Sequence, residues 1–164
     1  MNSLIKISWD TNLPIYSISQ SELQNKEIYC LLLDVDGTLV NSHSTKIPKA
    51  VKNWINESKK LFSLYLISNN PSQKRVEKIA KELNLKYKYN ASKPRKKVTL
   101  HAIKEVNGEA KNIAIIGDRI FTDIIVGNRC NIKTILVKRL KRDGLPINFN
   151  LTLTIEKFIS FFIK

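Results

Sequence analysis

Two aspartate-bearing segments have the composition of a site for metal binding and acid–base chemistry. Asp34 and Asp36 stand in the run DVDGTLV, and Asp118 and Asp123 stand in the run GDRIFTD. Residues two apart at an extended strand end point the same way, and carboxylates that close repel each other unless a cation or a proton compensates. Oxygen ligands of this kind suit a hard divalent cation. For each segment alone, the structural alternative is the capping of a turn or a helix.

Two further polar segments could complete such a site. Ser68-Asn69-Asn70 supplies a hydroxyl and amides that could hold phosphoryl oxygens, and Lys93-Pro94 supplies a cation. Each has an ordinary alternative, because Asn-rich turns and solvated lysines are common at protein surfaces. These two segments can contribute to a site only if the fold brings the four segments together.

Apolar runs and helical patterns alternate along the chain, and each polar segment follows an apolar run. The predicted strands are Tyr29–Val35, Leu64–Ser68, Lys86–Tyr89, Asn112–Gly117 and Lys133–Val137. The predicted helices are Pro48–Leu61, Pro71–Leu83, Pro94–Val106 and Phe121–Cys130. This alternation predicts an α/β fold with a central parallel sheet, helices on both faces and right-handed crossovers. Ligands bind beyond the carboxyl ends of such strands, where the polar segments fall.

The ordered set DVDGTLV, SNN, KP and GDRIFTD resembles the four motifs of haloacid dehalogenase (HAD) superfamily phosphatases. The resemblance covers about Tyr29 to Val137 and implies a Rossmann-like HAD fold. It implies that Asp34 is the nucleophile that forms an aspartyl-phosphate. It also implies that Asp36 is the general acid and base, which protonates the leaving group and then activates water.

The same resemblance implies the remaining site residues. Ser68 and Lys93 match residues that bind and neutralise the transferring phosphoryl group, with Gly37, Thr38 and Asn69 as further substrate-binding positions. The implied cofactor is Mg²⁺. Its expected ligands are Asp34, the backbone carbonyl of Asp36, Asp118 and, directly or through water, Asp123.

One domain over residues 1–164 is expected, and no cap domain, because residues 41–67 and 69–92 are too short for one. Its predicted parts are a lead-in segment over 1–27, a motif-bearing core over 28–138 and a C-terminal helix over 152–164. In the lead-in, apolar residues from Trp9 to Ile18 could pack against the sheet. The apolar positions of the terminal helix (Ile155, Phe158, Ile159 and Phe162) predict docking onto the domain, with contact to a membrane surface as the alternative.

The chain is strongly basic, with 28 Lys and Arg against 14 Asp and Glu and a formal net charge of +14. Basic residues gather after the third and last predicted strands, for example Lys86, Lys88, Arg95, Lys96, Lys97, Lys138, Arg139, Lys141 and Arg142. This rim on the active-site edge favours an anionic partner, most simply a phosphorylated lipid at a membrane surface. Nucleic acid fits less well, because Tyr87 and Tyr89 are the only aromatic residues nearby for base stacking. A solvated rim without a partner is the remaining alternative.

Within the superfamily the compact spacing resembles the YqeG-like group IIIA phosphatases, which include phosphatidylglycerophosphate phosphatases. The matching segments are SNN, Ala91-Ser92-Lys93-Pro94 and GDRIFTDIIVGNRCNIKTILV, and Gly37 departs from the group's usual residue. The implied function is magnesium-dependent hydrolysis of phosphatidylglycerophosphate. A capless phosphatase for nucleic-acid ends, phosphoproteins or small phosphoesters is one alternative, and a non-catalytic binding protein is another.

No signal peptide and no apolar run of ~20 residues is apparent in the sequence, so a cytoplasmic location is expected, with peripheral membrane attachment left open. The two cysteines, Cys30 and Cys130, are predicted to be reduced and buried, because they lack the spacing of a zinc site or a disulfide scaffold.

Overall fold

A six-stranded parallel sheet organises the chain in a computed structural model, which describes residues 4–147 and 151–162. The strand order is β1-β6-β5-β2-β3-β4. The strands are β1 (Trp9–Asp10), β2 (Cys30–Leu33), β3 (Ser63–Ile67), β4 (Lys86–Lys88), β5 (Ile113–Gly117) and β6 (Lys133–Leu136). The predicted α/β fold with a parallel sheet is confirmed. The central strands β2 and β5 are buried along their whole length, as expected for strands covered on both faces.

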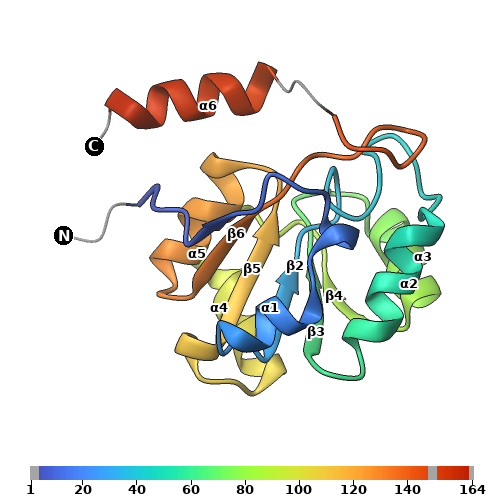
Figure 1. The fold of residues 1–164 in the computed structure, drawn as a ribbon. Helices are drawn as coiled ribbons and strands as arrows, with labels where there is room; N and C mark the ends of the chain where they lie inside the picture. Colours follow the sequence, from blue (N-terminus) through green and yellow to red (C-terminus); the bar gives the residue numbers. More distant parts are fainter. Residues whose placement is uncertain (1–3, 148–150, 163–164) are drawn as a thin grey trace.

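Helices cover both faces of the sheet (Figure 1). The regular helices are α1 (Gln20–Asn25), α2 (Lys49–Ser58), α3 (Gln73–Leu83), α4 (Lys96–Val106), α5 (Ile125–Arg129) and α6 (Leu151–Phe162). Side chains of α1, α2 and α3 share one apolar cluster with the sheet, and side chains of α4 and α5 share the cluster on the opposite face. Short turns lie at η1 (Ile15–Ser17) and η2 (Ala110–Asn112), and a π-helical turn, η3 (Ile120–Ile124), precedes α5.

The strand register places the ends of the central strands at the same level. Leu33 of β2 pairs with Leu66 of β3 and with Ile116 of β5. The backbone N–H of Asp34 then donates to the carbonyl of Ile116. Because neighbouring parallel strands lie about 4.8 Å apart, the residues that follow β2 and β5 emerge side by side.

The helices begin later than the sequence predicts. Helix α3 begins at Gln73 rather than Pro71, because Ser72 is the N-cap and its hydroxyl accepts a hydrogen bond from the backbone N–H of Arg75. Helix α4 begins at Lys96 rather than Pro94, because Arg95 is an N-cap with extended backbone. Pro94 therefore belongs to the loop that carries Lys93 rather than to α4.

The lead-in segment also forms an unpredicted edge strand. Trp9 and Asp10 pair with Ile135 and Leu136 of β6. Ile15 and Ile18 are buried as expected, and the carbonyl of Ile18 accepts a hydrogen bond of 2.7 Å from the Trp54 indole. The strand was missed because two residues are too short to show a period. Both cysteines are free and buried, as predicted.

The C-terminal helix α6 lies beyond the carboxyl ends of the strands and packs against η3 (Figure 1). Its orientation differs from the predicted docking. Ile155, Phe158 and Ile159 are 48%, 65% and 39% exposed, whereas Glu156 is 4% exposed and faces the protein. The last two residues of the predicted helix lie outside the described residues. No described helix combines the length and the apolar character needed to cross a bilayer.

Candidate active site

A pocket of about 120 Å³ lies at the carboxyl edge of the sheet. The segments after five strands, β2 to β6, supply its lining: Asp34, Asp36, Ser42, Asn69, Lys93, Arg119, Thr122, Asp123 and Arg139. A larger hollow of about 520 Å³ lies beside Tyr87 and His101 and contains a single acidic residue. The chemistry of the lining, rather than its size, therefore identifies the candidate site.

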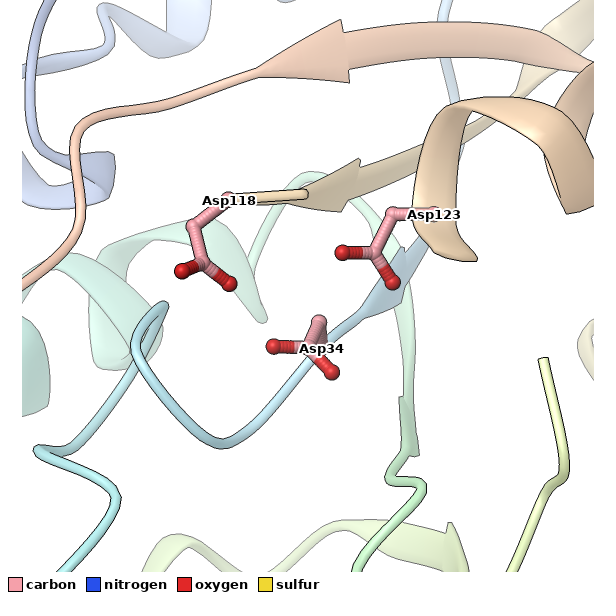
Figure 2. A group of neighbouring side chains, drawn as sticks. All are labelled: Asp34, Asp118 and Asp123. Carbon is pink, nitrogen blue, oxygen red and sulfur yellow. The ribbon is translucent and has the colours of Figure 1, made fainter. Parts of the chain in front are cut away.

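Three buried carboxylates form the floor of the site: Asp34 and Asp123 line the pocket itself, and Asp118 lies beside them. Figure 2 shows Asp34, Asp118 and Asp123 facing a common space. One oxygen from each lies within 4.8 Å of the others, and the three residues are 7%, 1% and 1% exposed. The sequence places Asp34 more than 80 positions before Asp118 and Asp123, and the parallel pairing of β2 with β5 brings them together.

Two glycines make room for these carboxylates. Gly37 has a φ of +98°, and a Cβ atom there would lie 2.6 Å from Asp118 Oδ2. A Cβ atom at Gly117 would overlap the carboxyl group of Asp123. Any side chain at either position would displace an acidic group, so Gly37 has a steric role besides its turn conformation.

Lys93 is the cation of the floor. Its ammonium donates to Asp34 Oδ1 and Asp123 Oδ1, both at 2.6 Å, and to the carbonyl of Ile67 at 3.2 Å. Burial alone would lower the pKa of Lys93, but the carboxylates of Asp123 and Asp34 outweigh it and raise the pKa above its ordinary value. Lys93 therefore carries a fixed positive charge beside Asp34.

Asp118 is the least compensated group of the floor. Among the described residues neither of its buried oxygens has a hydrogen-bond donor, although Arg139 Nη1 lies 3.3 Å from Oδ2. Burial, and then the charges of Asp34 and Asp123, raise the pKa of Asp118 well above its ordinary value. Burial also raises the pKa of Asp123 to about 6, against the opposing charge of Lys93. Such orphaned oxygens require an explanation, and a bound cation would supply one.

Asp36 has a different environment from the three floor carboxylates. Its Oδ2 accepts hydrogen bonds from Ser68 Oγ at 3.1 Å and Asn70 Nδ2 at 3.2 Å. Its Oδ1 forms an ion pair of 2.7 Å with Arg75 Nη2. The same guanidinium nitrogen donates to three carbonyls of the loop after the first motif, those of Asn41, Ser42 and Ser44. Arg75 thus fixes both Asp36 and the adjacent loop.

The remaining predicted site residues lie beside these groups. Thr38 Oγ1 donates to Asp34 Oδ2 at 3.1 Å, so both oxygens of Asp34 are oriented by a donor. The Gly37 N–H donates to the carbonyl of Val40. Asn69 pairs with the backbone of Lys93, donating to its carbonyl at 3.0 Å and accepting from its N–H at 2.7 Å. In this state Asn69 holds the Lys93 loop in place.

Sequence reasoning missed several residues that contact the site. Arg75 and Arg139 bind Asp36 and Asp118, and Arg119 and Glu156 form a contact at the rim. Arg119 lies within the last motif and Arg139 within the basic rim. The sequence therefore indicated their positions but not their roles. Arg75 sits in an ordinary Lys-rich helix and Glu156 in an apolar tail, and neither pattern carries a signal.

Comparison with known proteins supplies the family of this architecture. The family model described as "Mitochondrial PGP phosphatase" matches residues 2–140. The Bacillus subtilis (strain 168) protein YqeG, described as a probable phosphatase, is 28% identical over 137 residues, which cover 83% of this chain and 80% of YqeG.

Solved structures with similar folds include two metal-bound proteins. The Bacillus subtilis protein YfnB, described as a HAD-hydrolase bound to magnesium, superposes with a TM-score of 0.54 at 13% identity, covering 81% of this chain and 98% of YfnB. The cobalt-bound deoxy-D-mannose-octulosonate 8-phosphate phosphatase of Haemophilus influenzae superposes with a TM-score of 0.53 at 14% identity, covering 84% of this chain and 88% of that chain. At these identities the likeness concerns the fold.

Proposed function

The chain belongs to the family described as mitochondrial PGP phosphatase and is a phosphatase with a HAD fold; from this premise we propose that it is a magnesium-dependent hydrolase of phosphatidylglycerophosphate. One observation carries the proposal more than any other. Asp34 lies at the pocket floor with its oxygens oriented by Lys93 and Thr38, beside the orphaned oxygens of Asp118. The whole chain is proposed to act as one hydrolase domain.

The floor fits a hard divalent cation. The donor set consists of carboxylate oxygens, which Mg²⁺ prefers, and the two oxygens of Asp118 lack donors among the described residues. Asp34, Asp118 and Asp123 would hold the ion, with the backbone carbonyl of Asp36 as the further ligand that the motif implies. When bound, the ion would offset negative charge on the phosphoryl oxygens.

In the first step, a carboxylate oxygen of Asp34 attacks phosphorus. The bond from phosphorus to the glycerol oxygen breaks, and a proton from the Asp36 carboxyl group neutralises the departing alkoxide. Lys93, charged and already within 2.6 Å of Asp34, compensates charge on the equatorial oxygens. Thr38 and Lys93 hold Asp34 in line for this displacement, which is the main protein contribution to phosphoryl transfer.

In the second step, water attacks the phosphorus of the aspartyl-phosphate. Asp36 accepts a proton from this water, and the acyl-phosphate bond breaks to release inorganic phosphate and regenerate the carboxylate of Asp34. Ser68, Asn70 and Arg75 fix the position of Asp36 through both its oxygens. This clamp keeps the acid–base group at the edge of the pocket, 2.7 Å from Arg75, between turnovers.

The proposed lipid substrate rests on the surroundings of the pocket. Among the described residues, the regular structure is α2 alone between β2 and β3 and α3 alone between β3 and β4, which supports an open site without a cap. Helix α6 lies at the same edge and exposes Ile155, Phe158 and Ile159. An exposed apolar helix face beside basic residues suits an anionic bilayer surface. We therefore propose that the protein acts at such a surface. Its cytoplasmic location stays a prediction.

The test is phosphate release from phosphatidylglycerophosphate in anionic vesicles, with and without Mg²⁺. A panel of soluble phosphoesters and 5′-phosphorylated oligonucleotides runs beside it, with Asp34→Asn as the blank. We expect release from the lipid to exceed release from the panel, and to vanish without Mg²⁺ or in the variant.

Three results would change the proposal. Activity confined to soluble esters would remove the lipid assignment and keep the chemistry. Activity confined to oligonucleotides would favour the nucleic-acid alternative. Tight binding of phosphorylated ligands without turnover, in both wild type and Asp34→Asn, would favour the non-catalytic alternative.

A further inference from the structure

The rim of the pocket carries an arginine that the proposed chemistry does not use. Arg119 lines the same pocket as Asp34 and Lys93. Its side chain is 45% exposed, whereas that of Lys93 is 1% exposed. Arg119 therefore lies outside the floor, between the reacting groups and solvent. The other rim arginine, Arg139, already contacts Asp118 and donates to Ser42 Oγ at 2.6 Å.

Helix α6 orients Arg119 through a buried carboxylate. Arg119 Nε lies 3.6 Å from Glu156 Oε1, and Glu156 Oε2 accepts a hydrogen bond of 2.8 Å from the backbone N–H of Ile120. The Glu156 side chain is 5% exposed. Among the side chains that the structure describes, none forms a hydrogen bond with the two terminal nitrogens of Arg119. Within that set, Glu156 contacts one side of the guanidinium and leaves its terminal nitrogens available at the pocket.

Burial of Glu156 is an inefficient way to increase the stability of the fold. A buried carboxylate loses its hydration, and such pairs contribute little net stability compared with apolar residues of similar size. The same helix turns apolar Ile155 and Ile159 toward solvent. Burying the single acidic residue of α6 beneath an exposed apolar face makes sense if the carboxylate positions a group at the site.

The substrate chemistry indicates what Arg119 would bind. Under the proposed function, on which this inference rests, the substrate carries two phosphates joined by one glycerol unit. The transferring phosphoryl group meets Asp34 and Lys93 at the floor. The second phosphate, a diester that leads to the diacylglycerol, must then lie toward the opening, where α6 meets the pocket. A guanidinium with free terminal nitrogens binds a phosphate through two parallel hydrogen bonds.

We propose that Arg119, anchored by Glu156, is a subsite for the second, diester phosphate of the substrate. This subsite selects substrates with an anionic group one glycerol unit away from the scissile phosphate. It contributes to substrate binding and leaves the chemical step to the floor residues.

The test compares two soluble substrates in the presence of Mg²⁺. A short-chain phosphatidylglycerophosphate below its micelle concentration has both phosphates, and p-nitrophenyl phosphate has one. For Arg119→Gln we expect KM for the lipid to rise about tenfold to a hundredfold with kcat nearly unchanged. Kinetics with p-nitrophenyl phosphate should stay at the wild-type level, which also reports a folded site.

Two further variants and one control refine the test. Arg119→Lys should give an intermediate KM, because an ammonium keeps the charge without the planar fork. Glu156→Gln should raise KM for the lipid less than Arg119→Gln does. Lys78→Gln removes one exposed positive charge on α3, outside the basic rim and the pocket lining, and it should leave both substrates unaffected.

The outcomes separate this inference from the proposed function. If wild type hydrolyses p-nitrophenyl phosphate but not the lipid, the proposed substrate is wrong and the subsite loses its ligand. If wild type hydrolyses the lipid and Arg119→Gln either changes nothing or weakens both substrates equally, the subsite is wrong while the proposed function stands.

Discussion

The floor and the rim of the pocket are built on opposite principles. At the floor, Asp34, Lys93 and Asp123 are nearly inaccessible, and Lys93 contacts both carboxylates at 2.6 Å. At the rim, the Arg119 side chain is half exposed, and its guanidinium lies 3.6 Å from Glu156. The floor groups are fixed by one another, whereas the rim group depends on a helix from the end of the chain.

This difference separates chemistry from substrate choice. Buried charges in a low-dielectric site interact strongly, so under the proposed mechanism the floor would act on any phosphomonoester that reaches Asp34. Exposed groups act weakly on the reaction but contact the parts of a substrate that distinguish it. Floor substitutions should therefore affect all substrates, and rim substitutions should affect only some of them.

The largest expected effect is that of Asp34→Asn. Loss of the proposed nucleophile should lower activity at least about 10⁴-fold on every substrate, because binding groups alone cannot replace the proposed covalent step. Asn is nearly isosteric, so circular dichroism should remain that of wild type. Residual activity within tenfold of wild type would show that another group attacks phosphorus. The assignment of the chemistry to the floor residues would then be wrong.

Asp118→Asn should lower activity at least about a hundredfold and abolish stabilisation by Mg²⁺. Without metal, however, the variant should melt higher than wild type, by about 2–4 °C for each kcal/mol gained, because it removes a poorly compensated buried charge. Scanning calorimetry with and without Mg²⁺ measures both effects. Asp143→Asn, in an exposed turn, is the matched control and should change neither.

The pKa shifts of the floor predict an unusual pH dependence of the metal-free protein. Burial raises the pKa of Asp123 to about 6 and that of Asp118 above its ordinary value. The folded state then binds more protons than the unfolded state between pH ~4 and pH ~6, so stability falls as pH rises through this window. Mg²⁺ should reverse the trend, because it binds the deprotonated carboxylates. If the stability of the metal-free protein rose from pH 4 to pH 6, the result would contradict the raised pKa values of Asp118 and Asp123.

Arg75→Gln should lower kcat about tenfold to a hundredfold, because Asp36 would lose its ion pair and the adjacent loop its hydrogen bonds. The loss should be smaller with p-nitrophenyl phosphate, whose leaving group needs little protonation. Arg75→Lys should recover part of kcat, and Lys74→Gln, one residue away on α3, should have no effect. An equal loss on alkyl and aryl esters would assign Arg75 a structural role instead.

The smallest expected effect is that of Phe158→Gln on membrane binding. Removing the most exposed apolar side chain among those described on α6 should weaken binding to anionic vesicles about three- to tenfold and leave p-nitrophenyl phosphate hydrolysis unchanged. Leu61→Gln, which changes another exposed apolar residue in the turn between α2 and β3, is the control. Identical vesicle co-sedimentation of wild type, Phe158→Gln and Leu61→Gln would show that Phe158 of α6 does not contribute to membrane binding.

Local pattern predicted most of the elements and the motif residues. The apolar runs that became β2 and β5 are continuous and buried on both faces, so their strand character was visible without tertiary information. The helix starts at Pro71 and Pro94 were wrong by two residues, because capping by Ser72 and Arg95 depends on local backbone conformation. The edge strand β1 exists only because β6 offers it a partner.

The sequence by itself determined which residues can perform chemistry and that they would meet. A parallel sheet places all its strand ends at one edge, so Asp34, Ser68, Lys93 and Asp118 had to converge. Only the tertiary structure decided their partners. The pairs Asp36–Arg75, Asp118–Arg139 and Ile120–Glu156 join residues far apart in the chain. Such pairs depend on how helices and loops pack against the sheet, and side-chain periodicity records which face of a helix is apolar but not which distant group that helix will meet.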